Sequence, residues 1–296
     1  MAENTASPAK PRDQSPRARM LRRARSHTGF LISSAILILV VLIAILAPLA
    51  PHDPYKQDLL ARTVPPVFLG GSWEHILGTD ALGRDFLSRL MYGARISLSI
   101  GLVAVAISAV IGTTLGILAG FFGGRVDRVV LFIINVRLAL PGILIMLAVV
   151  SLFGGSLMTV MIVMGLLLWD RFAVVLRSAT RQVRSMEYIA AAEVQGASTL
   201  QLLVKDILPN IANHLIVIAT VELAHAIILE AALSFLGLGV QPPTPSWGLM
   251  ISEGKEMLLF DSWLITIPGI ALMILVLAIN MFGDGLRDIT EPEGRN

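Results

Sequence analysis

The sequence predicts an all-α membrane protein whose chain crosses the bilayer six times. Hydrophobic residues make up 55% of the 296 residues and charged residues only 15%, whereas a soluble domain has about 25% charged residues. Apolar runs are also long enough for helices to cross a bilayer, which takes about 20 residues each. These runs are residues 30–49, 96–122, 129–153, 157–176, 211–236 and 263–282.

The chain begins with a basic tail and a first transmembrane helix. Residues 1–28 are rich in Pro, Ser, Lys and Arg, a composition typical of disorder. Residues 29–51 carry no charge and form too long a run for a cleaved signal peptide, so we expect a retained helix. We then expect an extracytoplasmic segment over 52–95, a membrane core over 96–286 and a cytoplasmic tail over 287–296.

The uncharged run from 138 to 169 must be divided between two spans. As one helix it would be about 48 Å long, which exceeds the hydrocarbon core of about 30 Å. Gly154, Gly155 and Ser156 favour a tight turn inside the run. We therefore expect a hairpin between the third and fourth spans.

The distribution of Lys and Arg predicts that both termini face the cytoplasm. With the N-terminus inside, the cytoplasmic segments hold 16 Lys and Arg residues and the outer segments hold six. Positive charges concentrate on the cytoplasmic side of membrane proteins. The same assignment places the segment 177–210, between the fourth and fifth spans, in the cytoplasm.

The second span carries a stripe of small residues. The members recur at every fourth position and are Ala104, Ser108, Gly112, Gly116 and Gly120. Such residues share one helix face and let another helix approach closely. The stripe therefore predicts a helix-packing surface, whose partner helix belongs either to this chain or to a second subunit.

Residues 186–210, named the elbow here, interrupt the apolar pattern with charged and helix-breaking residues. We expect a short helix over 186–194 and a break at Gly196, because glycine readily adopts turn conformations. A second helix is predicted by the helical spacing of apolar residues, with Ser198 or Thr199 as its cap. Pro209 would then bend the chain into the fifth span. A generic amphipathic surface helix is the alternative.

The spacing within the elbow resembles the coupling motif of ABC-importer permeases. That motif reads Glu-Ala-Ala, three residues, Gly, nine residues and Ile-x-Leu-Pro. Here Ala190-Ala191-Ala192 precedes Gly196 by three residues, and Asp206-Ile207-Leu208-Pro209 follows nine residues later. Ala190 stands in place of the motif's glutamate, and Asp206 in place of its isoleucine.

Three further stretches resemble the same family. The stretch "HILGTDALGRDFLSRLMYGARISL" (75–98) is similar to the segment before the second span of peptide and nickel permeases, and "EAALSFLGLGVQPPTPSWGLMI" (230–251) to the segment after their fifth span. The stretch "GDGLRDITEP" (283–292) resembles their C-terminal tail. The chain thus resembles the C-type permease subunit of dipeptide, oligopeptide and nickel ABC importers, which implies a MetI-like type I importer fold with a cytoplasmic coupling helix.

The resemblance implies ATP-driven import of dipeptides or oligopeptides across a bacterial plasma membrane. The implied partners are membrane lipid, a homologous permease that forms a heterodimer with this chain, two ATPase domains and an extracytoplasmic solute-binding protein, with no nucleic acid. The residues implied to couple the elbow to the ATPase are Glu187, Ala190, Ala191, Ala192, Glu193, Gly196, Leu200, Leu208 and Pro209. Nickel, glutathione or haem are alternative substrates.

The chain itself is not expected to catalyse a reaction. It has no Gly-x4-Gly-Lys-Ser/Thr motif, which would hold nucleotide phosphates. ATP and Mg²⁺ would therefore bind to the partner ATPase subunits, and we expect no cofactor in this chain. It has no cysteine, and its histidines at positions 52, 75, 214 and 225 are scattered, so we expect neither catalytic residues nor a metal site.

Ionisable residues in the predicted spans are candidates for function, because charges in lipid are costly. Glu222 and His225 share a helix face, and they could line a translocation pathway, hold a metal or form an internal structural pair. Glu230 lies in the family-like stretch and is expected to be structural. Arg137 is expected to pair with one of these carboxylates or to contact a peptide carboxylate.

Two choices stay open at this point. The 52–95 segment, with Gly78, Gly83 and the charged residues at 80, 84 and 85, could contact a binding protein or partner subunit, or could form a salt-bridged structural cap. A proton-coupled secondary transporter is the alternative class, in which Glu222, His225 and Glu230 relay protons. That class explains the elbow poorly.

Overall fold

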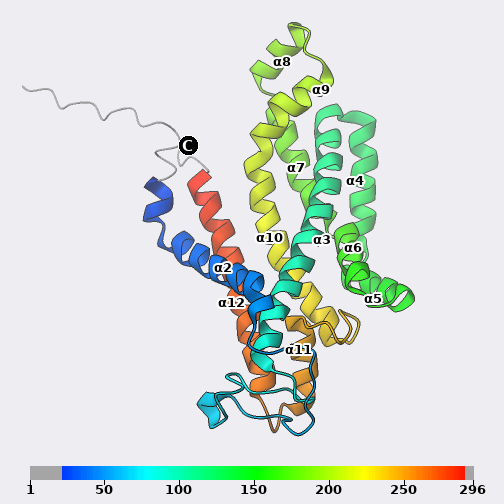
Figure 1. Ribbon diagram of the computed structural model, residues 1–296. Coiled ribbons are helices and arrows are strands. Elements are labelled where there is room, and N and C mark those ends of the chain that lie inside the picture. Colours follow the sequence, from blue (N-terminus) through cyan, green and yellow to red (C-terminus); the bar gives the residue numbers. More distant parts are fainter. Residues whose placement is uncertain (1–21, 291–296) are drawn as a thin grey trace, which may run out of the picture.

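The computed structural model describes residues 22–290, and this part of the chain is helical and contains no β-strand. Figure 1 shows long helices side by side, with the elbow at one end and the loop between α2 and α3 at the other. The α-helices are α2 (Thr28–Leu46), α3 (Phe86–Phe122), α4 (Gly124–Ala139), α5 (Gly142–Phe153), α6 (Leu157–Leu167), α7 (Trp169–Arg184), α8 (Glu187–Val194), α9 (Thr199–Gln201), α10 (Leu208–Phe235), α11 (Trp247–Gly254) and α12 (Trp263–Thr290). A π-helix, Leu202–Ile207, joins α9 to α10, and 3-10 turns cover Ala47–Leu49, Val67–Leu69 and Lys255–Met257.

Five continuous helical segments in the described range are long and apolar enough to cross a membrane. They are Thr28–Leu49, Phe86–Phe122, Leu157–Arg184, Thr199–Phe235 and Trp263–Thr290. The sixth predicted span, 129–153, is not one straight helix, because α4 and α5 meet at a bend of 79°. The predicted six spans are therefore obtained when this bent pair counts as one.

The bend follows from Pro141. Proline has no N–H to donate and forces the preceding residue out of the helical region, and Leu140 accordingly has an extended backbone, with φ −98° and ψ 127°. The predicted hairpin is present after α5: Gly154 has φ +86°, and the Ser156 hydroxyl accepts a hydrogen bond from the Thr159 N–H at the start of α6.

Several helices extend beyond their predicted bounds, among them α12, which continues past 282 to Thr290. Helix α3 begins ten residues before the expected position 96, because the Asp85 carboxylate caps it by accepting the Ser88 N–H at 2.8 Å. Its 37 residues span about 56 Å, so part of α3 extends beyond a hydrocarbon core of about 30 Å. Helix α7 continues past 176 to Arg184.

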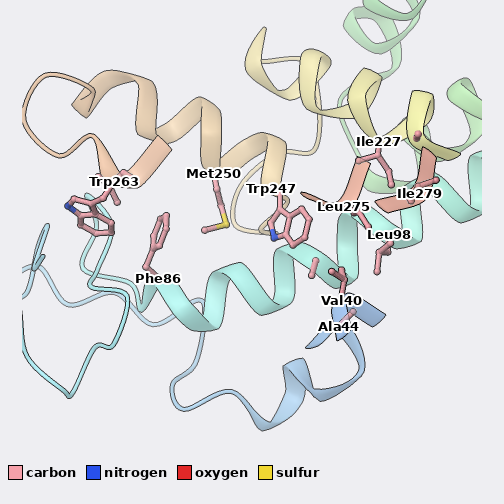
Figure 2. Close-up of a cluster of buried hydrophobic side chains, with 13 residues drawn as sticks. Val40, Ala44, Phe86, Leu98, Ile227, Trp247, Met250, Trp263, Leu275 and Ile279 are labelled. Atoms are coloured by element: carbon pink, nitrogen blue, oxygen red, sulfur yellow. The ribbon is translucent and has the colours of Figure 1, made fainter. Parts of the chain in front are cut away.

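A buried apolar cluster joins the first and last spans to α3, α10 and α11 (Figure 2). Trp247 is 3% exposed, packs against this cluster and donates its indole N–H to the Leu90 carbonyl oxygen at 2.9 Å. Trp263 meets the Phe86 ring edge-on, with centroids 5.2 Å apart. The cluster fixes the helix ends that flank the α2–α3 loop.

The two ends of the described range lie close together, where the start of α2 meets the end of α12. His27 Nε2 lies 3.2 Å from Asp288 Oδ2. The predicted disorder over 1–28 is wrong for residues 22–26, which are helical, because the His27 N–H donates to the Arg23 carbonyl oxygen at 3.0 Å. Residues 1–21 of the predicted tail lie outside the described residues, as do residues 291–296 of the tail predicted over 287–296.

Candidate functional site

The elbow is a pair of helices that projects beyond the rest of the chain (Figure 1). Helix α8 ends at Val194, and Gly196 turns the chain with φ +88°. The Ala197 N–H closes this turn by donating to the Ala192 carbonyl oxygen at 3.0 Å. A Cβ at position 196 would meet no atom within 4 Å, so lack of space does not explain the glycine. The explanation is the left-handed backbone, which glycine adopts without strain.

The second half of the elbow leads directly into α10. Ser198 caps α9 by accepting the Gln201 N–H, as the sequence predicts. Helical bonding then continues through the π-helix and past Pro209 into α10. The predicted bend of the chain at Pro209 is therefore wrong, because no helix ends there. Pro209 lies in the first turn of α10, where its missing N–H removes no hydrogen bond within that helix.

The elbow is attached to both neighbouring membrane helices. Ile189 is fully buried in a cluster with Val183 of α7 and Ile211 of α10. Arg184 at the end of α7 forms an ion pair with Glu193 at 2.6 Å. The Asn210 side chain donates to the Tyr188 hydroxyl at 3.1 Å. These contacts make α8 move together with the ends of α7 and α10.

The outer surface of the elbow is exposed and partly apolar. Eight of the nine predicted coupling residues are exposed: Glu187, Ala190, Ala191, Glu193, Gly196, Leu200, Leu208 and Pro209. The ninth, Ala192, is half-buried. Val194 is 90% exposed, Leu200 71% and Val204 53%. Sequence reasoning missed Val194 as a coupling residue. An apolar residue two positions before the break at Gly196 could have indicated an exposed contact residue.

The small-residue stripe of α3 packs against α6 and α7 of the same chain. All of its members are buried: Ala104, Ser108, Gly112, Gly116 and Gly120. A Cβ at Gly112 would lie 2.4 Å from the Trp169 carbonyl oxygen, and one at Gly120 would lie 2.7 Å from that of Arg177. The Ser108 hydroxyl donates to the Gly165 carbonyl oxygen at 2.8 Å. A second subunit's helix therefore does not occupy this stripe.

A buried carboxylate links α10 to α7. Glu222 is fully buried, and its Oε1 lies 3.0 Å from Nη1 of Arg171 on α7. His225 Nδ1 lies 3.4 Å from Glu222 Oε2. The side chains of Arg171 and His225 are 52% and 37% exposed, so they extend from the buried carboxylate to the surface. Sequence reasoning missed Arg171, because it counted this residue among the cytoplasmic positive charges although the residue lies inside the predicted fourth span, 157–176.

Arg137 is not the partner of Glu222 or Glu230, so the expected pairing with one of these carboxylates was wrong, whereas its contact with a peptide carboxylate stays a prediction. Its guanidinium donates to the Leu167 carbonyl oxygen at 2.5 Å and lies 3.5 Å from that of Leu140. Both carbonyls stand at breaks in helices, where they lack an intrahelical donor. The two terminal nitrogens of the Arg137 guanidinium thus find carbonyl partners at nearby helix ends, whereas its buried Nε has no hydrogen-bond partner.

Two further polar clusters hold neighbouring segments together. Glu230 is fully buried, and its Oε1 accepts the hydroxyls of Ser234 and Ser246 at 2.8 Å each, so it joins α10 to the start of α11. Arg177 of α7 donates to both carboxylate oxygens of Asp127 on α4. Glu230 and the pair of Arg177 and Asp127 bind groups of this same chain, so their contacts stabilise the arrangement of its helices.

The 52–95 segment holds a network of buried charges. Asp80 Oδ2 lies 2.6 Å from Arg84 Nε and 3.2 Å from Arg89 Nε. Glu253, in the last turn of α11, accepts from both arginines, at 3.1 Å from Arg84 and 2.7 Å from Arg89. Gly78 and Gly83 have positive φ angles of 78° and 74°. Of the two alternatives for the 52–95 segment, this network of ion pairs within the chain agrees with the salt-bridged structural cap.

Comparison with known proteins assigns the chain to a family. Residues 112–295 match the family described as "Binding-protein-dependent transport system inner membrane component". The chain belongs to this family of inner membrane transport components. Residues 15–66 also match the N-terminal transmembrane domain of oligopeptide transport permease C. The family is one of multi-pass membrane permeases of bacterial ABC importers.

Individual relatives agree with this assignment. The di/tripeptide transport system permease protein of Pseudomonas aeruginosa is 39% identical over 88% of this chain and 86% of its own. The glutathione transport system permease protein of Pectobacterium atrosepticum is 39% identical over 76% of this chain and 74% of its own. A chain of the inward-facing MetNI methionine ABC transporter shares the fold, with a TM-score of 0.56 at 21% identity over 68% of this chain and 96% of that one.

Proposed function

We propose that this chain is the peptide-translocating permease subunit of an ATP-driven importer, and that an ATPase subunit binds its elbow. Family membership supports binding-protein-dependent transport. The relatives named as di/tripeptide and glutathione permeases support a small peptide as substrate. ATP and Mg²⁺ are bound by the ATPase subunits, and this chain hydrolyses nothing.

The observation that carries the proposal is the projecting elbow with its apolar tip. Val194 and Leu200 are largely exposed there, whereas Ile189 fixes the base of α8 by burial. Exposed apolar groups gathered on a projecting segment favour a protein contact. The alanines at 190–192 have small side chains, so a partner surface can approach the backbone closely.

The complete transporter contains more chains than this one. A homologous permease pairs with it as a heterodimer, two ATPase domains bind the elbows, and an extracytoplasmic binding protein delivers the peptide. Both termini are cytoplasmic; the excess of Lys and Arg on that side and the location of the start of α2 and the end of α12 toward the elbow end of the molecule support this orientation (Figure 1).

The group of Arg171, Glu222 and His225 contributes to the pathway for substrate. Ionisable residues inside membrane helices are costly and typically mark substrate or ion pathways. The half-exposed guanidinium of Arg171 can meet a peptide carboxylate while Glu222 holds it in place. His225, on the other oxygen of Glu222, can meet the same substrate.

Site-directed cross-linking tests the proposal, because the chain has no native cysteine. Leu200→Cys places a single thiol on the elbow tip, and Leu60→Cys, on a fully exposed residue of the α2–α3 loop, is the matched control. In membranes containing the whole transporter, a short maleimide–benzophenone cross-linker, bound to the introduced thiol and then photoactivated to insert into a nearby C–H bond, should join the Leu200→Cys chain to an ATPase subunit and leave the Leu60→Cys chain free of it. The reverse pattern would refute the proposal.

A transport assay distinguishes the importer from the proton-coupled class. Uptake of a radiolabelled dipeptide is followed in proteoliposomes with ATP held constant. Collapse of the proton gradient should leave the rate unchanged, whereas removal of ATP should abolish uptake. Loss of uptake on collapse of the gradient alone would instead support a secondary transporter.

A further inference from the structure

We propose that His52, His75 and Asp85 form a binding site for one divalent cation of the zinc class. These residues come from three parts of the chain: the exit from the first span, a turn in the α2–α3 loop, and the cap of α3. One ligand atom from each lies within 4.8 Å of the others. Scattered sequence positions hid this group, since the spacing 52, 75 and 85 matches no metal motif.

The two imidazoles converge on a single oxygen. His75 Nδ1 lies 2.8 Å and His52 Nδ1 lies 3.5 Å from Asp85 Oδ1. In a tetrahedral zinc site with bonds of about 2.0–2.1 Å, neighbouring donor atoms lie about 3.3 Å apart. The two distances to Asp85 Oδ1 fall on either side of that value, and all three ligand atoms lie within 4.8 Å of one another, so the donors are close to the spacing that a zinc site requires.

The Asp85 carboxylate lacks the cationic partners that its neighbour has. Asp80 is buried and meets two arginines. Asp85 is 3% exposed, yet its ion-pair partners among residues 22–290 are imidazoles, which carry charge only when protonated. Its Oδ2 accepts the Ser88 N–H, so Oδ1 is the oxygen left for a cation. A buried carboxylate is costly without such compensation.

The Nδ1 atom of His52 supplies an independent indication of a ligand. It is buried and has no hydrogen-bond partner, although buried polar atoms are nearly always paired. The His52 backbone N–H donates to the Ser88 hydroxyl at 3.2 Å, which holds the residue beside the cluster. A metal bond to the Nδ1 lone pair satisfies this atom, with the ring hydrogen of each histidine on Nε2.

The donor set selects the class of cation. Two imidazole nitrogens and one carboxylate oxygen suit Zn²⁺, with water as the fourth ligand. Ca²⁺ and Mg²⁺ require oxygen ligands in larger number. The bound cation would link the end of the first span to the start of α3, and it would stabilise this loop independently of the proposed transport function.

Zinc titration of the full-length chain, purified with its copurifying subunits, tests the site. The affinity tag must contain no histidine, and the protein is treated with EDTA and dialysed before Zn²⁺ is added in equilibrium dialysis. His52→Gln and His75→Gln remove the ligands, and His214→Gln, an exposed histidine on α10, is the control. Asp85 is left intact because it caps α3.

We expect one Zn²⁺ per chain that the wild type and His214→Gln bind equally, with at least tenfold weaker binding in each ligand variant. Zn²⁺ should also raise the thermal unfolding midpoint of the wild type and leave that of His75→Gln unchanged. Each protein is compared with and without Zn²⁺, so the result does not depend on its stability in the absence of the metal. Mg²⁺ should produce neither effect. Equal zinc binding by wild type and ligand variants, or equal weakening by His214→Gln, would overturn the proposal.

Discussion

The contact between α3 and α7 predicts that Gly112→Ala destabilises the protein, although alanine favours helices more than glycine does. A Cβ at position 112 would lie 2.4 Å from the Phe172 Cβ and 2.4 Å from the Trp169 carbonyl oxygen. Ordinary contact begins at 3.4 Å, so the two helices must separate by about 1 Å. Because one obstacle is backbone, no side-chain rotation relieves the overlap.

The magnitude follows from the cost of overpacking. Extra methyl groups in a packed core cost about 1–3 kcal/mol, which exceeds the gain of about 1 kcal/mol in helix propensity. A net loss of up to about 2 kcal/mol lowers the unfolding midpoint by roughly 2–4 °C for each kcal/mol in a chain of this size. Thermal unfolding in detergent, followed by intrinsic fluorescence, measures the shift.

Gly269→Ala is the matched control for this substitution. Gly269 also lies inside a membrane helix, α12, but a Cβ there would meet no atom within 4 Å. Its substitution should leave the midpoint unchanged or raise it slightly. If Gly112→Ala unfolds at the same temperature as Gly269→Ala, the close approach of α3 and α7 is not the reason for the small residue.

Three further substitutions test the polar contacts. Arg171→Ala leaves the fully buried Glu222 carboxylate without its cation, so it should lower the free energy of unfolding by roughly 1–3 kcal/mol. The double variant with Glu222→Gln should recover most of this loss in thermal unfolding, and no recovery would refute the pair. Arg137→Met removes the hydrogen bond to a helix-end carbonyl, so it should lower the free energy of unfolding by about 1 kcal/mol and with it the unfolding midpoint. Arg125→Met, on an exposed residue of the same helix, should leave the midpoint unchanged, and equal effects of the two substitutions would contradict this reasoning. Glu253→Gln weakens the partner of two buried arginines and should increase trypsin cleavage of the α2–α3 loop, and an unchanged cleavage rate would exclude a capping role.

Features set by neighbouring residues could be predicted from the sequence. The break at Gly196, the cap at Ser198 and the hairpin at 154–156 each depend on the local preferences of the residues that form them. The length of the apolar runs likewise located the membrane helices. The bend at Pro141 was also a local signal, and it was overlooked because the run around it was uniformly apolar.

Features set by tertiary contacts could not be predicted in the same way. The pair of Arg171 and Glu222 joins residues 51 positions apart, and no periodicity relates them. The partner of the α3 stripe stayed open between two helices, since small residues permit a close approach without specifying which helix makes it. The cluster of His52, His75 and Asp85 depends on the path of a loop, which residue spacing does not determine.

Helix α7 connects the elbow to the bent pair α4–α5 through contacts at both of its ends. At the elbow end, Arg184 binds Glu193 of α8, and about two turns into the helix Arg177 binds Asp127 of α4. At the other end, Arg137 of α4 donates to Leu167, immediately before α7 begins.

The glycine contacts with α3 fill the length between these ends. Packed interiors have little free space and transmit displacement instead of absorbing it. A partner bound to α8 would therefore act on α7, and the break between Leu140 and Pro141 lies at the far end of this chain of contacts. We infer that this bend is where movement of the elbow changes the shape of the membrane region, which gives Arg137 a positioning role that the apolar sequence around it conceals.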